Sequence, residues 1–255
     1  MISGRRGSGT IFFANCCLSC VYCQNYEISQ SRGTDRELRE EQGVARIMLA
    51  LQEQGVHNIN LVSPTHYGVQ LAEAIRSAKR QGLTVPVVYN TGGYDTVELL
   101  RELAGLVDIY LPDFKYWTDE PAVKYSGAEN YPEVTRQGIA EMFRQVGNIE
   151  LDHEGVARKG VLVRHLVLPN NLAESEKVLA FLAALSKKLW ISLMAQYNPQ
   201  HQAAAYPEIS RPLRPAEYQA AVSAAEALGL ENVYLQELAS SELFLPDFKK
   251  DDPFK

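Results

Sequence analysis

The sequence predicts an α/β fold with a parallel sheet, and two observations support this prediction. Apolar runs of strand length alternate about six times with segments of helical periodicity. The strand candidates are apolar on both faces, which suits strands that are covered on both sides. With 46% hydrophobic and 22% charged residues in 255, the composition is that of an average soluble globular protein. Periodicity leaves two arrangements open: an open doubly wound sheet and a full or partial (β/α) barrel.

The first half of the chain supplies four strand candidates. The first is a β-branched and aromatic run at residues 10–14, and a helix is expected at 36–54, directly before Gly55. The alternation continues with strand 58–62, helix 70–81, strand 85–89, helix 95–104 and strand 107–111. Asp95 is the expected N-cap of the helix at 95–104.

The second half begins with a longer excursion at residues 116–160, expected to hold one helix near 132–146 and a polar hairpin around 152–155. The alternation then resumes with strand 160–168, helix 173–188, strand 190–194, helix 215–228 and a last strand at 232–235. No linker or genuine repeat divides the chain. We therefore expect a single domain over 1–255, with a core at about 8–236 and a C-terminal tail at 237–255.

Charge and hydropathy exclude several classes of protein. No apolar run approaches the roughly 18 residues needed to span a bilayer, so no membrane partner is expected. Residues 1–7 lack the apolar core of a secretory signal. A net charge of −6 gives no general attraction to nucleic acid, so no nucleic-acid partner is expected either.

The four cysteines all fall between Cys16 and Cys23. Disulfides in so short a segment would close only very small loops, which constrain the unfolded chain little. Thiols gathered in this way indicate metal or cluster chemistry in a reducing, cytoplasmic setting.

The cysteine spacing allows two ligand sets. Cys16, Cys20 and Cys23 form C-x3-C-x2-C, whereas Cys17 with the last two forms C-x2-C-x2-C. The second pattern begins a bacterial ferredoxin motif, but the fourth cysteine followed by proline is absent. Zinc usually takes a second pair of ligands elsewhere in the chain, and none is obvious. Three ligands to a four-iron cluster leave one iron open to a small molecule.

The segment 9–26, which carries Cys16-x3-Cys20-x-Tyr22-Cys23 after a short strand, resembles the signature of the radical S-adenosylmethionine (SAM) superfamily. Within that superfamily the chain is similar to the pyruvate formate-lyase activating enzymes and their homologues. The similarity continues through residues 58–62, 89–94, 113–115, 164–169 and 196–199. It implies a partial (β/α)6 TIM-like barrel that is open at one side.

The resemblance also implies cofactors and chemistry. One [4Fe-4S] cluster is expected on Cys16, Cys20 and Cys23, with SAM bound to the open iron; Cys17 is expected not to be a ligand. One electron from the reduced cluster cleaves SAM, and the resulting 5′-deoxyadenosyl radical abstracts hydrogen from a substrate. An electron donor such as flavodoxin or ferredoxin is the implied partner.

Further SAM contacts are implied at the ends of successive strands, where either arrangement places functional residues. Residues 63–66 stand where relatives have a Gly-Gly-Glu-like segment that contacts the SAM amino group, and Thr65 is expected to accept that hydrogen bond instead. Asn90 replaces a family aspartate. Lys115 is expected near the SAM carboxylate. For Arg164, Gln196 and Tyr197, a satisfied polar group of the core is the competing interpretation. The full expected set of SAM-binding residues is Tyr22, Thr65, Asn90, Thr91, Asp113, Lys115, Arg164, Gln196 and Tyr197.

Three functions remain as hypotheses. The first is activation of a partner protein by hydrogen abstraction, as when activating enzymes install a glycyl radical. The second is radical modification of a small molecule or peptide. The third, a passive iron–sulfur electron carrier, predicts no SAM binding and gives no role to the polar residues at the strand ends.

Overall fold

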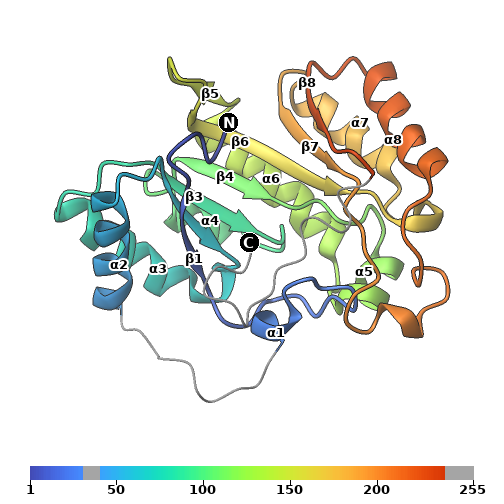
Figure 1. Ribbon diagram of the computed structural model, residues 1–255, viewed down its shortest axis with the longest axis horizontal. Helices are drawn as coiled ribbons and strands as arrows, with labels where there is room; N and C mark the ends of the chain where they lie inside the picture. The colour runs from blue at the N-terminus through green and yellow to red at the C-terminus, as the bar shows by residue number, and fades with distance from the viewer. Residues whose placement is uncertain (31–40, 239–255) are drawn as a thin grey trace.

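Seven parallel strands form one curved sheet in the order β1-β2-β3-β4-β6-β7-β8 (Figure 1). The structure is a computed structural model that describes residues 1–30 and 41–238. The strands of this path are β1 (Gly9–Phe12), β2 (Ile59–Val62), β3 (Val87–Thr91), β4 (Ile109–Pro112), β6 (Ala157–Leu166), β7 (Trp190–Met194) and β8 (Asn232–Leu235). The short β5 (Glu150–Leu151) pairs antiparallel with β6 and forms the expected polar hairpin.

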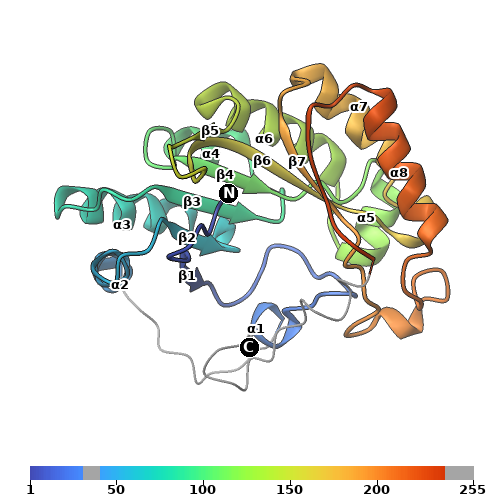
Figure 2. The same ribbon diagram turned by 45° about the horizontal axis from the view of Figure 1, so that its top comes forward.

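Neighbouring strands along most of this path are consecutive in the sequence, which requires a crossover between each pair. The crossovers hold the helices α2 (Glu41–Glu53), α3 (Gly68–Arg80), α4 (Val97–Glu102), α5 (Asp119–Ser126), α6 (Tyr131–Val146), α7 (Ser175–Leu185) and α8 (Pro215–Ala227). Three single turns, η1 (Thr65–Tyr67), η2 (Pro169–Asn171) and η3 (Ala203–Ala205), and the short α1 (Tyr26–Ser29) complete the described elements. Figure 2 shows α6, α7 and α8 outside the sheet, whereas α1 and the cysteine segment lie on its inner side.

The path begins at β1 and ends at β8, and these two strands do not pair with each other in the part of the chain that the structure describes. The predicted parallel α/β sheet is therefore confirmed, and its strand order is that of a partial barrel with an open side. Every residue of β3 and β4 is buried. Both faces of the central strands are thus covered, as their apolar sequences predicted.

The core contains an unusual number of tyrosines. Six are less than 2% exposed: Tyr89, Tyr110, Tyr116, Tyr125, Tyr131 and Tyr197. A buried phenol needs a hydrogen-bond partner for its hydroxyl group. Each of these six hydroxyls has a hydrogen-bond partner, so polar contacts run through an otherwise apolar core.

The sequence-based boundaries need several corrections. β6 begins three residues earlier and ends two residues earlier than expected. β3 begins and ends two residues later than expected, and α5 was not expected at all. Asp95 is not an N-cap, because Thr96 precedes α4 and its side chain accepts a hydrogen bond from the backbone N–H of Leu99. The expected helix residues 36–40, and residues 239–255 of the expected tail, lie outside the described residues.

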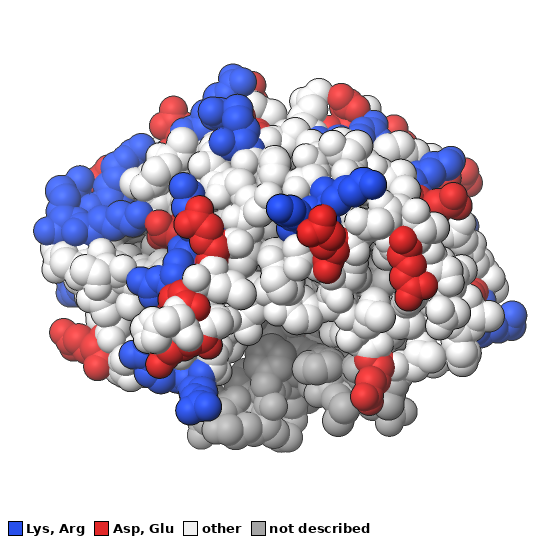
Figure 3. All heavy atoms as spheres, turned by 90° about the horizontal axis from the view of Figure 1, so that it is seen from above, with Lys and Arg blue, Asp and Glu red and all other residues white. Residues whose placement is uncertain are grey.

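Acidic and basic side chains are intermixed on the face seen in Figure 3. Ion pairs such as Arg76–Glu73 and Arg136–Glu133 join neighbours on the helices. No helix among the described residues is both long enough and apolar enough to cross a membrane.

Candidate active site

The segment that carries the cysteines is held in place by backbone hydrogen bonds from two other parts of the chain. The N–H groups of Ser19 and Val21, on either side of Cys20, donate to the carbonyls of Ser126 (2.9 Å) and Tyr125 (2.8 Å) in the last turn of α5. The carbonyl of Val21 in turn accepts from the backbone of residue 202, at 2.8 Å. The position of Cys20 is therefore fixed by elements far away in the sequence.

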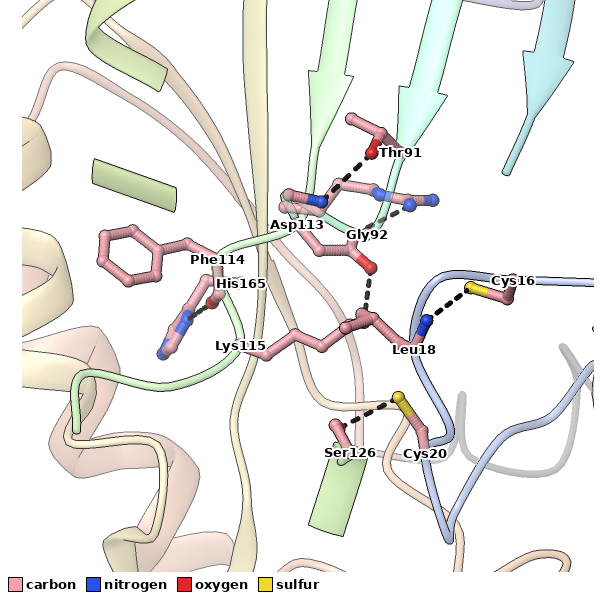
Figure 4. A network of polar contacts seen from close by, with 12 residues as sticks. Cys16, Leu18, Cys20, Thr91, Gly92, Asp113, Phe114, Lys115, Ser126 and His165 are labelled. Carbon is pink, nitrogen blue, oxygen red and sulfur yellow. Dashed lines mark hydrogen bonds and ion pairs between the residues drawn. The ribbon is translucent and has the colours of Figure 1, made fainter. Parts of the chain in front are cut away.

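Each thiol of the C-x3-C-x2-C motif has one hydrogen-bond partner. The backbone N–H of Leu18 donates to Cys16 Sγ (3.4 Å), Ser126 Oγ lies 3.0 Å from Cys20 Sγ, and Ser29 Oγ lies 3.2 Å from Cys23 Sγ. Figure 4 shows the first two of these contacts. All three partners can donate a hydrogen bond to a thiolate. Cys17, by contrast, is exposed.

Burial raises the pKa of two of these thiols, Cys20 and Cys16. It raises the pKa of Cys20 to about 12, although the nearby Lys115 acts in the opposite direction. A thiolate at either position therefore needs a bound cation, and iron would supply it. Three thiols on one segment, each next to a hydrogen-bond donor, fit the ligand set of a [4Fe-4S] cluster with one open iron.

A cavity of about 180 Å³ lies beside this segment. It is lined by eight of the residues that the sequence singled out: Cys20, Tyr22, Cys23, Asp113, Lys115, Arg164, Gln196 and Tyr197. Residues not anticipated also line it: Gln24, Asn25, Leu166, Met194 and Asn198. The carboxyl ends of β4, β6 and β7 thus meet the cysteine segment around one space, as expected for an α/β sheet.

Asp113, at the end of β4, joins two cations in this cavity. Its Oδ2 lies 2.5 Å from Nζ of Lys115, and its Oδ1 lies 2.7 Å from Nη2 of Arg164 on the neighbouring strand β6. Burial alone would raise the pKa of Asp113, but Arg164 and Lys115 outweigh it and hold the pKa below its usual value. Burial alone would lower the pKa of Lys115, but Asp113, together with Cys20 and Tyr131, outweighs it and raises the pKa.

This triad has one positive charge in excess. In addition, the Nε atom of Arg164 is buried and has no hydrogen-bond partner within the described residues. A buried donor without a partner costs free energy, and an anionic ligand would remove that cost. The cavity therefore fits a carboxylate such as that of SAM.

The structure places Thr65 and Thr91 outside the residues that line this cavity. Their hydroxyls donate to the two carboxylate oxygens of Asp95, at 2.7 and 2.6 Å, and Tyr89 donates to the same group at 2.8 Å. Burial raises the pKa of Asp95, while the three hydroxyls act to lower it. Asn90 is buried in β3. The expected contacts of Thr65, Asn90 and Thr91 with SAM stay predictions.

Gln196 and Tyr197 follow β7 at the opposite wall. The amide of Gln196 accepts from Gln236 at 2.8 Å and donates to Gln24 at 3.3 Å. The ring of Tyr197 meets that of Tyr22 edge-on, with 5.5 Å between centroids. Its hydroxyl donates a hydrogen bond to the backbone carbonyl of residue 209, so this buried hydroxyl has a partner. The residue itself forms part of the cavity wall.

His165 supports the triad from behind. It is fully buried, with Nδ1 at 2.6 Å from the carbonyl oxygen of Phe114 and Nε2 at 2.9 Å from Ser175 Oγ. A neutral imidazole with its proton on Nδ1 satisfies both contacts, because Nε2 then accepts from the serine. Since Phe114 lies between Asp113 and Lys115, this histidine fixes the backbone that carries both charges (Figure 4).

We expect His165 to make the stability of the protein depend on pH. Burial lowers its pKa from 6.5 to about 4. Between these values the unfolded chain binds a proton that the folded protein does not, so stability falls as the pH falls through this window, by about 3 kcal/mol in total. Urea unfolding of the iron-free protein at several pH values measures this slope.

The matched variants for this experiment are His165→Gln and His153→Gln. The first should flatten the pH dependence in the window, whereas the second replaces an exposed histidine and should leave it intact. An unchanged slope in His165→Gln would show that other groups cause the dependence.

Three hydroxyl-bearing residues at the site were missed in the sequence. Ser126 and Tyr116 lie in the excursion after β4, and Ser29 lies in α1, far from any strand end. The only sequence signals were Thr118 before α5 and Gly127 after it, which are ordinary helix start and stop residues. Nothing in the sequence indicated that the last residue of this helix contacts Cys20.

Comparison with known proteins agrees with the geometry. Residues 10–182 match the family model of the radical SAM superfamily, and the chain belongs to that superfamily. It is 31% identical over 236 residues to the uncharacterised protein MJ0674 of Methanocaldococcus jannaschii, which covers 89% of this chain. The chain spans 64% of the length of that relative.

Solved structures share the fold at low sequence identity. The chain is similar to SuiB of Streptococcus suis bound to S-adenosylmethionine, with a TM-score of 0.63 and 13% identity over 91% of this chain and 52% of that one. It is also similar to the FeFe-hydrogenase maturase HydG of Carboxydothermus hydrogenoformans, with a TM-score of 0.59 and 15% identity over 88% and 51%. The chain thus spans about half the length of these structures.

Membership of the superfamily defines the cofactors as a [4Fe-4S] cluster and SAM. In this superfamily the bound cluster, once reduced, supplies one electron that cleaves SAM and so provides a 5′-deoxyadenosyl radical for hydrogen abstraction. An enzyme of this class needs an external reductant.

Proposed function

We propose that this enzyme activates a partner protein by abstracting hydrogen from it, as in the formation of a glycyl radical. Two features support the proposal. The motif and the strand-end segments resemble the activating enzymes over nearly the whole chain. The sheet also ends at two strands that do not pair with each other in the described part of the chain, so the barrel leaves an open side next to the cysteine segment.

We assign the three cysteines and the cavity residues to separate tasks. Cys16, Cys20 and Cys23 hold the cluster, and the side chain of Cys17 stays outside the ligand set. Lys115 and Arg164 bind the SAM carboxylate, while Asp113 orients both cations, because it contacts each of them directly. The wall for the adenosyl group is formed by Tyr22, Gln196 and Tyr197. SAM is also bound from the ends of β2 and β3, by Thr65, Asn90 and Thr91.

The cavity is the observation that carries this assignment. It brings two of the three cysteines and an excess positive charge, contributed by neighbouring strands, around one space. A passive electron carrier has no need for such a space. Modification of a peptide is the second candidate, because the related fold of SuiB has been solved with its precursor peptide SuiA, with a TM-score of 0.58 and 11% identity.

The activation hypothesis is tested by electron paramagnetic resonance (EPR). We expect the reduced, cluster-loaded protein to generate a glycyl radical signal when SAM and its proper glycyl radical enzyme partner are added, and Cys20→Ala to generate none. Candidate partners are assayed one by one, with short peptides tested in parallel by mass spectrometry. Modification of a peptide with no radical in any protein partner would favour the second candidate.

A further inference from the structure

Three buried hydroxyl groups form a chain that ends on Cys20. The hydroxyl oxygens of Tyr22 and Tyr116 lie 2.5 Å apart, Tyr116 lies 2.7 Å from Ser126 Oγ, and Ser126 Oγ lies 3.0 Å from Cys20 Sγ. Tyr116 and Ser126 are fully buried and Tyr22 is 5% exposed, so water does not compete for these bonds. Figure 4 shows Ser126, at the end of α5, pointing at Cys20.

Counting hydrogens gives this chain a direction. A cluster-bound Cys20 is a thiolate and can only accept, so Ser126 must donate its single hydrogen to the sulfur. The oxygen of Ser126 then accepts from Tyr116, and Tyr116 accepts from Tyr22. Three hydroxyl hydrogens serve three bonds, all pointing towards the sulfur. Such chains polarise one another, so each bond strengthens the next.

The hydroxyls cannot easily turn away from this arrangement. Ser126 is fixed by its own carbonyl, which accepts from Ser19 N–H at 2.9 Å. The ring of Tyr116 packs edge-on against Tyr131, with 5.7 Å between centroids, and Tyr22 packs against Tyr197. The Ser126 hydroxyl therefore points at Cys20 Sγ both before and after the cluster is reduced. It stabilises the added charge without having to move first.

The other two cysteines have weaker partners. Cys16 accepts one backbone N–H at 3.4 Å, and Cys23 contacts Ser29 at 3.2 Å, with no second hydroxyl behind that serine among the described residues. The shortest of the three contacts, and the only one backed by a chain of hydroxyls in the described structure, is at Cys20. The three ligands are thus electrostatically unequal.

We propose that Ser126 and Tyr116 are positioning residues that set the reduction potential of the cluster by directing a chain of hydrogen bonds onto the sulfur of Cys20. Hydrogen bonds to cluster sulfurs tune the potential, because they stabilise the reduced state, which carries one more negative charge. The chain therefore makes the cluster easier to reduce. The proposal rests on Cys20 being a cluster ligand.

The test is an EPR-monitored redox titration of the cluster-loaded protein without SAM. We expect Ser126→Ala to lower the equilibrium constant for reduction of the cluster about tenfold. This change corresponds to a midpoint potential that is lower by about 59 mV for one electron. Tyr116→Phe keeps the direct donor but cuts the chain, so it should shift the potential in the same direction by less. Ser126→Thr keeps the hydroxyl and should restore the wild-type value.

Tyr110→Phe is the matched control, since it removes another buried tyrosine hydroxyl, bonded to Gln145 at 2.7 Å and not to this chain. A fully loaded Ser126→Ala protein with an unchanged potential overturns the proposal. If Ser126→Ala does not hold iron, the midpoint potential of Tyr116→Phe is the test, and an unchanged potential in that variant overturns the proposal. Full iron binding in Cys20→Ala would instead overturn the ligand assignment, and the proposal with it.

Discussion

Replacement of Cys20 by alanine is expected to abolish cluster binding, whereas replacement of Cys17 is expected to leave it intact. The wild-type protein should bind about four irons per chain after anaerobic reconstitution, because three thiolates and an open position are sufficient for one [4Fe-4S] cluster. Cys20 is buried and held by two backbone hydrogen bonds around it, so no other thiol can take its place. Iron analysis and the absorbance of the cluster measure this result.

Cys17→Ala is a stringent control, since Cys17 adjoins Cys16 but has different surroundings. Burial raises the pKa of Cys17 to about 11, and the neighbouring Cys16 and Asp95 raise it further. Cys16, in contrast, is influenced by both Lys115 and Cys23. Retained iron in Cys16→Ala together with lost iron in Cys17→Ala would assign the other spacing to the cluster.

Asp113→Asn is expected to destabilise the protein by about 3 kcal/mol, because it leaves two partly buried cations without their counter-charge. The side chains of Asp113 and Lys115 are only 12% and 14% exposed, while that of Arg164 is 28% exposed and keeps some contact with water. The expected loss of stability is therefore at the lower end of the range for breaking a buried ion pair. Chemical unfolding at neutral pH measures the difference in the free energy of unfolding.

The sign of the pH effect provides a second check on Asp113. Since its pKa is lowered in the folded protein, its contribution is complete above its unfolded pKa of about 3.9 and is lost as the pH falls through the lower folded value. Glu133→Gln is the control, because Glu133 pairs with Arg136 at the surface and is 59% exposed. Its removal should cost much less, because water screens an exposed ion pair. An equally small loss in Asp113→Asn would mean that the triad does not need its carboxylate.

Much of the fold could be predicted because its signals are local. The order of strands and helices follows from hydrophobic periodicity, and the parallel sheet follows from their alternation. Asp113 and Lys115 lie at the end of one strand, and the structure places Arg164 of the adjacent strand against Asp113. A charged residue inside an apolar strand is costly unless paired, so this part of the site could be anticipated.

The remainder depends on contacts that local patterns do not encode. Ser126 lies 106 residues from Cys20 in the sequence, and the helix that carries it has only eight residues. Asp95 is a residue type that favours the N-cap, but two hydroxyls from β3 and one from η1 donate to its carboxylate, which leaves the cap to Thr96. Tertiary hydrogen bonds thus override the local preference of a residue whose side chain is buried.

Reductive cleavage of SAM tests the central claim most directly. The reconstituted protein is incubated anaerobically with dithionite and SAM, and the products are separated by chromatography. We expect 5′-deoxyadenosine and methionine in the wild-type protein and neither in Cys20→Ala. A protein with a full complement of iron that forms no 5′-deoxyadenosine would contradict the assignment of this cavity to radical SAM chemistry.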